Sequence, residues 1–396
     1  MGILSRFRRA LSSTETPAET RSATSDSYAA AFGIRPTASG QYVNAALAEN
    51  LSTVTACIGA VASAMASLPA YVYRSRTGGR TEATDHPAAR LLRRPCHGLT
   101  WPDWMEWLMG QVLAHGNAVC AIEYDGAGRV NALVPIPWGS VSISLLPSGR
   151  LAYDVVQYVA PWGGTGRPRR LLDGEVFHLK DRSDDGLTGR SRISRAPEVL
   201  GNALALQDWS GSMWRNQATP SGAVELEGSL TDQQFMRLRE QFSQNFTGTS
   251  NARKVLILDN RATWRALSVS PEDAEVLASR RFTVEELCRL YQVPPPIVQD
   301  YTHNTFTNSQ QAALWFAQFS LSPWAKKIEA EFSRSVFTDP AMQLEIDLAG
   351  LMRGDFQARW AAWEIAVRNQ ILDINEVRET EGYSPRPAQQ QAAPNA

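Results

Sequence analysis

Cysteine and histidine are scarce in this chain. Its 396 residues include four cysteines and five histidines. The cysteines form no C-x-x-C pair, and no histidine follows them at zinc-finger spacing, although Cys96 and His97 are adjacent. We therefore expect reduced, buried thiols in a reducing compartment, with no disulfide framework, no metal and no cofactor.

Catalytic signatures are missing as well. The chain has no G-x-x-x-x-G-K-[ST] loop, because the glycine-rich run Gly163–Arg167 lacks the lysine and the preceding apolar strand. It has no H-E-x-x-H and no G-x-S-x-G motif. His178 lies inside an apolar stretch, where a hydrogen-bonded core histidine is the simpler interpretation. These absences indicate a protein that is not an enzyme.

One acidic cluster keeps an enzymatic alternative open. Asp181, Asp184 and Asp185 lie close together beside Lys180 and Arg182. A metal-dependent nuclease or hydrolase holds its metal with such a cluster. The same residues also suit a solvated, glycine-containing loop, which is the simpler interpretation.

Charges of the two signs are balanced. Lys and Arg number 39 against 40 for Asp and Glu, which argues against a broad cationic surface that grips nucleic acid. Residues 50–73 carry no charge and are long enough to cross a bilayer. They are rich in small residues and poor in large aliphatic ones, so we expect a closely packed helix and no membrane contact.

Both ends of the chain have the composition of disordered segments. Residues 1–40 are rich in Ser, Thr, Glu and Ala, and residues 386–396 in Gln, Ala and Pro. Three basic residues, Arg6, Arg8 and Arg9, lie near the start. They suit either a solvated arm or a contact with DNA or lipid.

The hydrophobic pattern between these ends predicts an α+β protein. In residues 41–195 the predicted strands are Ala118–Tyr124, Val130–Val134, Val141–Leu145, Leu151–Val156 and Val176–Leu179. A predicted helix over Trp101–Leu113 carries Trp101, Trp104 and Trp107. Tryptophans at this spacing indicate a packing face rather than a binding stripe.

A small α/β insert is predicted between two long helices. The first helix covers Ala196–Gln217. The insert contains the predicted strand Ala223–Leu226, helix Thr231–Phe246 and strands Val255–Leu258 and Thr263–Ser268. The second helix begins near Pro271 and is amphipathic, with Arg281, Glu285 and Arg289 opposite its apolar face.

Three consecutive prolines end the second helix. Pro294, Pro295 and Pro296 cannot donate backbone hydrogen bonds, so the chain must turn at Pro294. The polar loop that follows has short hydrogen-bonding side chains and aromatic residues, which indicates a contact surface. Its candidate contact residues are Tyr301, His303, Asn304, Thr305, Phe306 and Thr307.

Two further helices are predicted after this loop. Ser309–Leu321 is apolar almost all round, which predicts a helix buried on several sides. Ser322 and Pro323 predict an N-cap that kinks or restarts this helix up to Phe337. A C-terminal helix, with Asp355 as its N-cap, has one apolar face made of Phe356, Trp360, Trp363 and Val367.

Short motifs along the chain occur in the order found in one family. They are Ala56–Ala62, Leu68–Tyr73, His86–Pro87, Gly116–Ala118, Leu133–Pro137, Arg280–Leu287, Tyr291–Pro295, Asn304–Gln311, Leu321–Trp324, Asn375–Arg378 and Gly382–Pro385. Over residues 43–385 the chain resembles the portal proteins of tailed double-stranded DNA bacteriophages, including the portals of gene transfer agents.

The resemblance implies the portal fold and assigns a part to each segment. The parts are a disordered N-terminal arm (1–40), the first part of the wing (41–195), stem helices (196–218 and 269–294), a clip (219–268), a tunnel loop (295–308), a kinked helix with the second part of the wing (309–337), a short crown (338–385) and a disordered tail (386–396).

The resemblance also implies a function. The chain is expected to form a ring, of twelve copies, at one capsid vertex of a virion or phage-like particle assembled in a bacterial cytoplasm. The resemblance implies that double-stranded DNA passes through the channel without sequence readout. It also implies that the tunnel-loop residues face this DNA and that Arg281, Glu285 and Arg289 line the channel or form ion pairs between stems. Expected partners are the large terminase, the head–tail adaptor and the major capsid protein. Phage and gene transfer agent both remain open.

Overall fold

A computed structural model provides the coordinates of the chain. The residues that it describes are 37–76, 79–156, 167–215, 223–226, 231, 233, 236, 262–265, 272–301, 306–348, 356–381, 383, 384 and 386. Contacts divide the chain into two compact units. One unit is Met1–Ala48 with Pro197–Glu272, and the other is Glu49–Ala196 with Asp273–Ala396.

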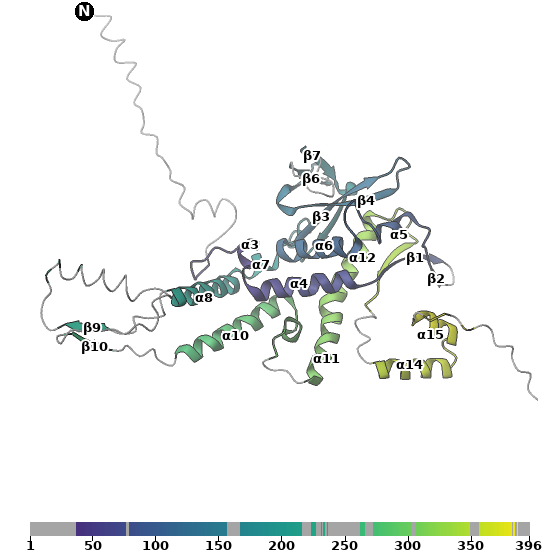
Figure 1. The fold of residues 1–396 in the computed structure, drawn as a ribbon. Helices are drawn as coiled ribbons and strands as arrows, with labels where there is room; N and C mark the ends of the chain where they lie inside the picture. The colour runs from purple at the N-terminus through teal and green to yellow at the C-terminus, as the bar shows by residue number, and fades with distance from the viewer. Residues whose placement is uncertain are drawn as a thin grey trace, which may run out of the picture. The chain divides into compact units, whose positions relative to one another are not determined.

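The larger unit is built around the antiparallel sheet β4-β3-β8 (Figure 1). Its strands are β3 (Asn117–Tyr124), β4 (Val130–Ile136) and β8 (Val176–Lys180). A second antiparallel sheet, β5-β6-β7, comprises Val141–Leu145, Leu151–Val155 and Arg169–Leu172. Five of these six strands were predicted and are confirmed to within two residues at each end, whereas β7 was not predicted.

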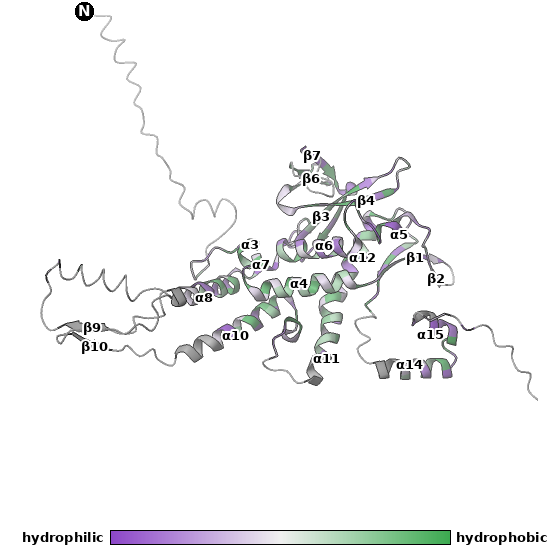
Figure 2. Ribbon diagram, in the orientation of Figure 1, coloured by the Kyte–Doolittle hydropathy of each residue, from purple (hydrophilic) through white to green (hydrophobic). Residues whose placement is uncertain are grey.

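Two helices pack on each other in the larger unit. They are α4 (Ser52–Ser67) and α6 (Trp101–His115), and α6 also covers β3 (Figure 1). A capping box begins α6, because Thr100 and Asp103 exchange side-chain to backbone hydrogen bonds. Gly116 ends it in the left-handed conformation, with φ 81°. Figure 2 shows α4 pale to green, consistent with its lack of charged residues.

The tryptophans of α6 belong to an aromatic core. Trp101 and Trp104 are buried, and Trp107 is half-buried. The Trp104 ring lies 5.7 Å from the Phe177 ring of β8 and 6.3 Å from the Phe332 ring of α12, which spans Ser322–Ser335. The predicted packing face is therefore confirmed for Trp101 and Trp104.

Helix α12 connects the central sheet to a third sheet. This sheet, β11-β1-β2, comprises Met342–Ile346, Ala70–Arg76 and Gly79–Glu82. The Glu331 carboxylate accepts the backbone N–H of His178 in β8 at 2.8 Å, and the Glu329 carboxylate accepts that of Ile346 in β11 at 3.1 Å. One helix thus accepts a backbone N–H from an edge strand of each of two sheets.

Strand β11 lies in the segment 338–385, which the resemblance assigns to a short crown. In the structure, β11 pairs with β1 in antiparallel register from Ala70 opposite Ile346 to Arg74 opposite Met342. Local sequence does not show this pairing, because it joins strands about 270 residues apart.

The remaining elements of the larger unit are mostly helical. They are α5 (Pro87–Leu91), α7 (Arg192–Arg195), α10 (Glu272–Tyr291), α11 (Phe306–Trp315), the π-helix η5 (Phe316–Leu321), α14 (Phe356–Arg368), α15 (Ile374–Thr380) and the 3₁₀ turns η1 (Trp138–Ser140), η2 (Asp173–Glu175) and η4 (Pro295–Val298). Trp363 of α14 donates to Glu381 after α15 at 2.8 Å. The predicted N-cap Asp355 lies outside the described residues.

The described residues of the smaller unit form one long helix, a short helix and one strand pair. Its elements are α3 (Ala45–Ala48), α8 (Pro197–Arg215) and the antiparallel strands β9 (Ala223–Leu226) and β10 (Ala262–Arg265). Glu198 of α8 accepts the backbone N–H of Ala38 at 2.9 Å, and Asp208 accepts from Gln41 at 3.1 Å. The predicted helix Thr231–Phe246 lies largely, and the strand Val255–Leu258 entirely, outside the described residues.

Two glycines meet where the loop after β8 crosses the end of α6. A Cβ atom on Gly189 would lie 2.0 Å from the carbonyl oxygen of Gly116, and one on Gly116 would lie 2.5 Å from the backbone nitrogen of Ser191. Both contacts are with backbone atoms, which cannot rotate away. The close approach therefore requires glycine at both positions.

We predict that Gly189→Ala lowers the free energy of unfolding by about 3 kcal/mol, because the methyl group forces the two backbones apart. Urea unfolding followed by circular dichroism measures the change. Gly174→Ala is the matched control, since no atom lies within 4 Å of its added Cβ. Equal stability of the two variants would contradict the prediction.

Candidate functional site

The candidate site is the end of α10 with the turn and loop that follow it. In the described part of α10, Leu287, Cys288 and Tyr291 are buried, whereas Arg281 and Arg289 are exposed. The predicted apolar and charged faces are therefore confirmed for this part of the helix. The buried face holds the end of α10 against the body, which fixes the point from which the loop departs.

A left-handed residue ends α10 before the prolines do. Gln292 has φ 59°, its N–H donates to the Arg289 carbonyl at 3.1 Å, and the N–H of Val293 donates to the Cys288 carbonyl at 2.9 Å. This is the hydrogen-bond pattern of a Schellman motif, with buried Val293 supplying its apolar contact. Pro294 then excludes a further helical hydrogen bond.

A second left-handed residue sets the start of the loop. Pro295–Val298 form the 3₁₀ turn η4, and Gln299 follows with φ 65°. The Ser320 hydroxyl donates to the Gln292 carbonyl, so the turn is also fixed to η5. Glycine usually occupies such positions, and two glutamines there give no signal of a turn in the sequence.

Helix α11 begins inside the predicted loop. Tyr301, before the helix, is 61% exposed, and α11 begins at Phe306. Phe306 and Thr307 are thus the first residues of a helix, whereas the sequence placed them in the loop. His303, Asn304 and Thr305 lie outside the described residues.

The side chain of Arg192 holds the C-terminal end of α10 in place. Its guanidinium lies 3.2 Å from the Asp181 carboxylate and donates to the Leu290 carbonyl at 3.3 Å. It also lies over the rings of Tyr291 and Trp324, at 5.9 and 5.8 Å from their centroids. The Arg192 and Asp181 side chains are only 13% and 10% exposed, so removal of either leaves a buried charge without its partner, at a cost of about 3–5 kcal/mol.

The sequence does not distinguish Arg192 from its neighbours Arg190 and Arg195. Its role depends on Asp181, Leu290 and Trp324, which come from three separate parts of the chain. No pattern within residues 190–195 indicates these partners. Sequence reasoning therefore missed the residue that anchors the site.

The charged face of α10 carries an ion pair within the helix. Arg289 lies 2.7 Å from the Glu285 carboxylate, one turn earlier, and its guanidinium lies 5.9 Å from the centroid of the Phe282 ring. The Arg289 side chain is 63% exposed. Exposed pairs of this kind contribute at most about 1 kcal/mol, so Arg289 can exchange its partner at little cost.

The long helix after the loop differs from its prediction in two ways. Ser322 is not an N-cap, because it has helical backbone angles and its N–H donates to the Ala317 carbonyl five residues earlier. The π-helix η5 therefore joins α11 to α12 directly before Pro323, which lacks the N–H of a regular helix.

The second difference concerns burial. Leu314, Trp315 and Phe319 are 46%, 62% and 48% exposed, and the rings of Trp315 and Phe319 lie 4.5 Å apart. The sequence predicted a helix buried on several sides. In the single chain, Phe316 and Leu321 are buried on one side of the helix, whereas the side with Leu314, Trp315 and Phe319 is exposed.

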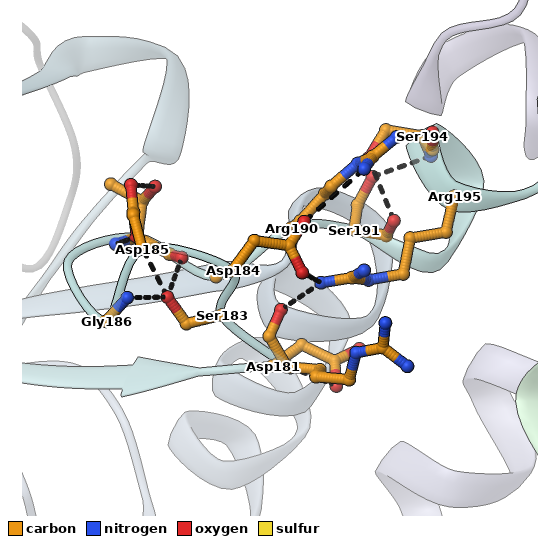
Figure 3. A network of polar contacts seen from close by, with 12 residues as sticks. Asp181, Ser183, Asp184, Asp185, Gly186, Arg190, Ser191, Ser194 and Arg195 are labelled. Atoms are coloured by element: carbon orange, nitrogen blue, oxygen red, sulfur yellow. Dashed lines mark hydrogen bonds and ion pairs between the residues drawn. The ribbon is translucent and has the colours of Figure 1, made fainter.

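The acidic cluster is engaged in loop structure (Figure 3). Asp184 lies 2.7 Å from Arg195 and 3.3 Å from Arg190. Asp185 accepts the backbone N–H groups of Leu187 and Thr188 at 2.7 and 2.9 Å, and these bonds lower the pKa of its carboxyl to about 2.

No metal site is apparent near this cluster. Among the described residues, no group of three or more His, Cys, Asp or Glu side chains is arranged to hold a metal ion. Asp181 is paired with Arg192 instead. The metal-dependent nuclease or hydrolase alternative has no support.

His178 is a core histidine, as predicted. Its Nε2 lies 3.0 Å from Asn117 Oδ1, and its Nδ1 lies 3.0 Å from the Tyr153 hydroxyl. The Asn117 amide also donates to the Gly189 carbonyl and accepts its N–H, both at 2.7 Å. Asn117 Oδ1 is therefore the acceptor, so Nε2 carries the proton and Tyr153 donates to Nδ1. Burial lowers the pKa of His178 to about 3 and keeps it neutral.

The four cysteines are free and buried, in agreement with the sequence prediction. Within the described part of the chain, none of the helices has both the length and the hydropathy of a membrane span. This finding agrees with the interpretation of residues 50–73 as the packed helix α4.

Comparison with known proteins identifies the family. The model for "Phage portal protein" matches residues 52–382. The chain belongs to the phage portal protein family. It is 30% identical over 367 residues to the probable portal protein of Streptomyces phage phiC31, and the match covers 88% of this chain and 78% of that relative. It is also 30% identical over 346 residues to the portal protein of Enterobacteria phage HK97, with 85% and 80% covered.

The portal fold is also found in a solved structure. In the neck of a native gene transfer agent particle, computed with C12 symmetry, one chain is 20% identical and superposes with a TM-score of 0.56. The match covers 85% of this portal protein and 91% of that chain. The family and the α+β portal fold predicted from the ordered motifs are thus confirmed.

We predict that the stability of this portal protein decreases below pH 6.5 because of His178. Its pKa is about 3 in the folded chain and 6.5 in the unfolded chain, so the unfolded state binds more protons between these values. Each pH unit in this window lowers the free energy of unfolding by up to about 1.4 kcal/mol. Urea unfolding between pH 4 and 7 measures the slope.

His178→Gln is the control for this prediction, because it retains hydrogen-bonding groups but does not titrate. The slope of stability against pH should be smaller in the variant than in the unmodified chain. An unchanged slope would assign the pH dependence to other groups.

Proposed function

We propose that this portal protein forms a ring of twelve copies at one capsid vertex, and that double-stranded DNA enters and leaves the particle through its channel. Membership of the portal family and the fold shared with a twelvefold-symmetric particle neck support this proposal. The particle is a phage or a gene transfer agent. In a cyclic ring each chain contacts two neighbours through different surfaces, which gives the exposed aromatic side of α11 and η5 a possible role in assembly.

The observation that carries the proposal is that the loop after α10 begins at a fixed position. The Schellman motif, the three prolines and the buried Arg192 hold both the helix end and the turn. The loop between Gln299 and α11 then follows, with exposed Tyr301 in it. A ring repeats this loop around its axis, so many weak contacts surround the DNA and none needs to read its sequence.

The composition of the loop suits DNA that must slide. Between Tyr301 and Thr307 the chain has no lysine or arginine, so the loop makes no charged contact with phosphates unless His303 is protonated. Each such contact would bind the DNA more tightly and slow its passage. Tyr301, His303, Asn304, Thr305, Phe306 and Thr307 are the proposed DNA-facing residues.

The charged face of α10 has two possible positions in the ring. Arg281, Glu285 and Arg289 line the channel wall or form ion pairs with the neighbouring stem. The exposed pair between Glu285 and Arg289 is compatible with both, because its arginine exchanges partners at little cost. The segment 219–268 is the proposed clip, which docks the large terminase and later the head–tail adaptor; the wing contacts the major capsid protein.

We predict that the purified protein has the native mass of a ring and shows a central hole of duplex width. Light scattering after gel filtration gives the mass, and negative-stain imaging shows the hole. A chain that stays monomeric at every salt and protein concentration would contradict the proposal.

We predict that Tyr301→Ala combined with His303→Ala leaves the ring intact and lowers the amount of DNA retained in particles severalfold, because the loop loses its largest contact groups. Tyr124→Ala, at a tyrosine that is 47% exposed on β3, is the matched control. Particle DNA is quantified after nuclease treatment. Normal DNA content in the loop variant would argue against a DNA-facing loop.

A further inference from the structure

A group of arginines extends from the C-terminal end of α5. Arg90 lies in its last turn, and the backbone N–H groups of Arg93 and Arg94 donate to the Arg90 carbonyl at 3.1 and 3.0 Å. Three arginines therefore start from one helical turn, and all three are exposed, as is His97 just after them. We call Arg90, Arg93, Arg94 and His97 the α5 patch.

The surrounding segment concentrates positive charge in a chain that is nearly neutral. Residues 74–97 contain six arginines and two acidic residues, against 39 basic and 40 acidic residues in the whole chain. These two acids lie beside other groups, Glu82 near Tyr73 and Asp85 near His86 at the other end of α5, and Glu345 pairs with Arg80. Glu123 is the carboxylate close to the patch, beside Cys96.

Arg93 and Arg94 have no carboxylate partner among the ion pairs of the described residues. Three arginines within one turn repel one another. Without a partner this arrangement is unfavourable, and an anion placed across them removes the repulsion.

The α5 patch stands on a fixed base. Ala88 and Leu91 of α5 are buried, and α5 packs against β4 and β1. Arg90 donates to the Asn131 carbonyl of β4 at 3.1 Å, and the Pro95 carbonyl accepts the N–H of Leu133 at 2.8 Å. The arginines are therefore held at defined positions and do not lie on a mobile terminus.

The surroundings of the patch favour phosphate over a protein partner. Protein interfaces depend on a few large apolar or aromatic anchors. Among the described residues 48–123, no large hydrophobic side chain is exposed. Tyr124, which pairs with Val130 beside Asn131, is an exposed aromatic residue near Arg90, and its hydroxyl donates to the Gly174 carbonyl at 3.0 Å, so the patch itself consists of charge. Guanidinium groups bind phosphate through paired hydrogen bonds, and such contacts need no apolar area.

We propose that the α5 patch binds the phosphate backbone of duplex DNA outside the channel. The patch spans about one helical turn, roughly 6 Å, which suits contacts with neighbouring phosphates of one strand. DNA binding by the patch in a particle also rests on the proposed ring. The ring presents one patch per subunit, so many weak contacts act together. The chain would then contact DNA at two places. The loop after α10 would do so without lysine or arginine, and the α5 patch would do so through its arginines.

Covalently closed circular DNA tests this proposal, because a closed circle cannot thread a channel. The variant is Arg93→Glu with Arg94→Glu, and the matched control is Arg182→Glu with Arg368→Glu, which changes the net charge equally at exposed arginines elsewhere. A second comparison, Arg8→Glu with Arg9→Glu, reports the basic residues at the N-terminus. Filter binding gives the affinity over a range of salt concentrations.

We expect the α5 variant to bind closed circles about eightfold more weakly per lost phosphate contact at 0.1 M salt, with a log–log salt slope shallower by about 0.9 per contact. The control and the N-terminal variant should bind as the unmodified chain does. Native mass is measured for every variant, so loss of the ring, which would contradict the proposed function, is seen separately from loss of DNA binding.

Two results would overturn the proposal. In the first, the α5 variant binds closed circles as tightly as the control. In the second, neither protein binds circles, but the α5 variant fails to enter capsids while the control enters; the patch would then contact an acidic surface of a capsid protein.

Discussion

The candidate site depends on one buried ion pair, between Arg192 and Asp181. The guanidinium donates to the Leu290 carbonyl near the end of α10 and lies against Tyr291 and Trp324, so it connects the loop after β8, the end of α10 and the start of α12. Such a pair stabilises little in total, because both charges lose their hydration. The ion pair instead fixes the position of the end of α10. If the helix end rotated or shifted, a buried charge would lose its partner.

A rigid body surrounds this anchor and leaves some surfaces uncovered. The aromatic core of Trp104, Phe177 and Phe332 joins α6, β8 and α12, and the glutamates of α12 cover the edges of two sheets. Outside this body, Trp315 and Phe319 remain exposed although they are paired aromatic rings. Large exposed aromatic groups indicate a surface that is completed by another molecule. The division between body and surface fits a chain that acts as one member of an assembly.

The acidic cluster illustrates why residue types alone do not define a site. Asp181, Asp184 and Asp185 are the residues that a metal-dependent enzyme would need. Here their oxygens accept from arginines and backbone N–H groups, and the low pKa of Asp185 follows from those bonds. The carboxylates hold the loop in shape, and the loop in turn holds Arg192. Their chemistry is used for position and not for a reaction.

The family could be predicted from short motifs in their order along the sequence. Five strands of the two central sheets, the two faces of α10 and the end of α10 before Pro294 could also be predicted, because they depend on local periodicity and proline geometry. The pairing of β11 with β1, the anchoring role of Arg192, the π-helix η5 in place of an N-cap at Ser322 and the exposed side of α11 were visible only in the folded chain. Each of these features depends on groups far apart in the chain or on packing around a helix, and neither is encoded in a local pattern.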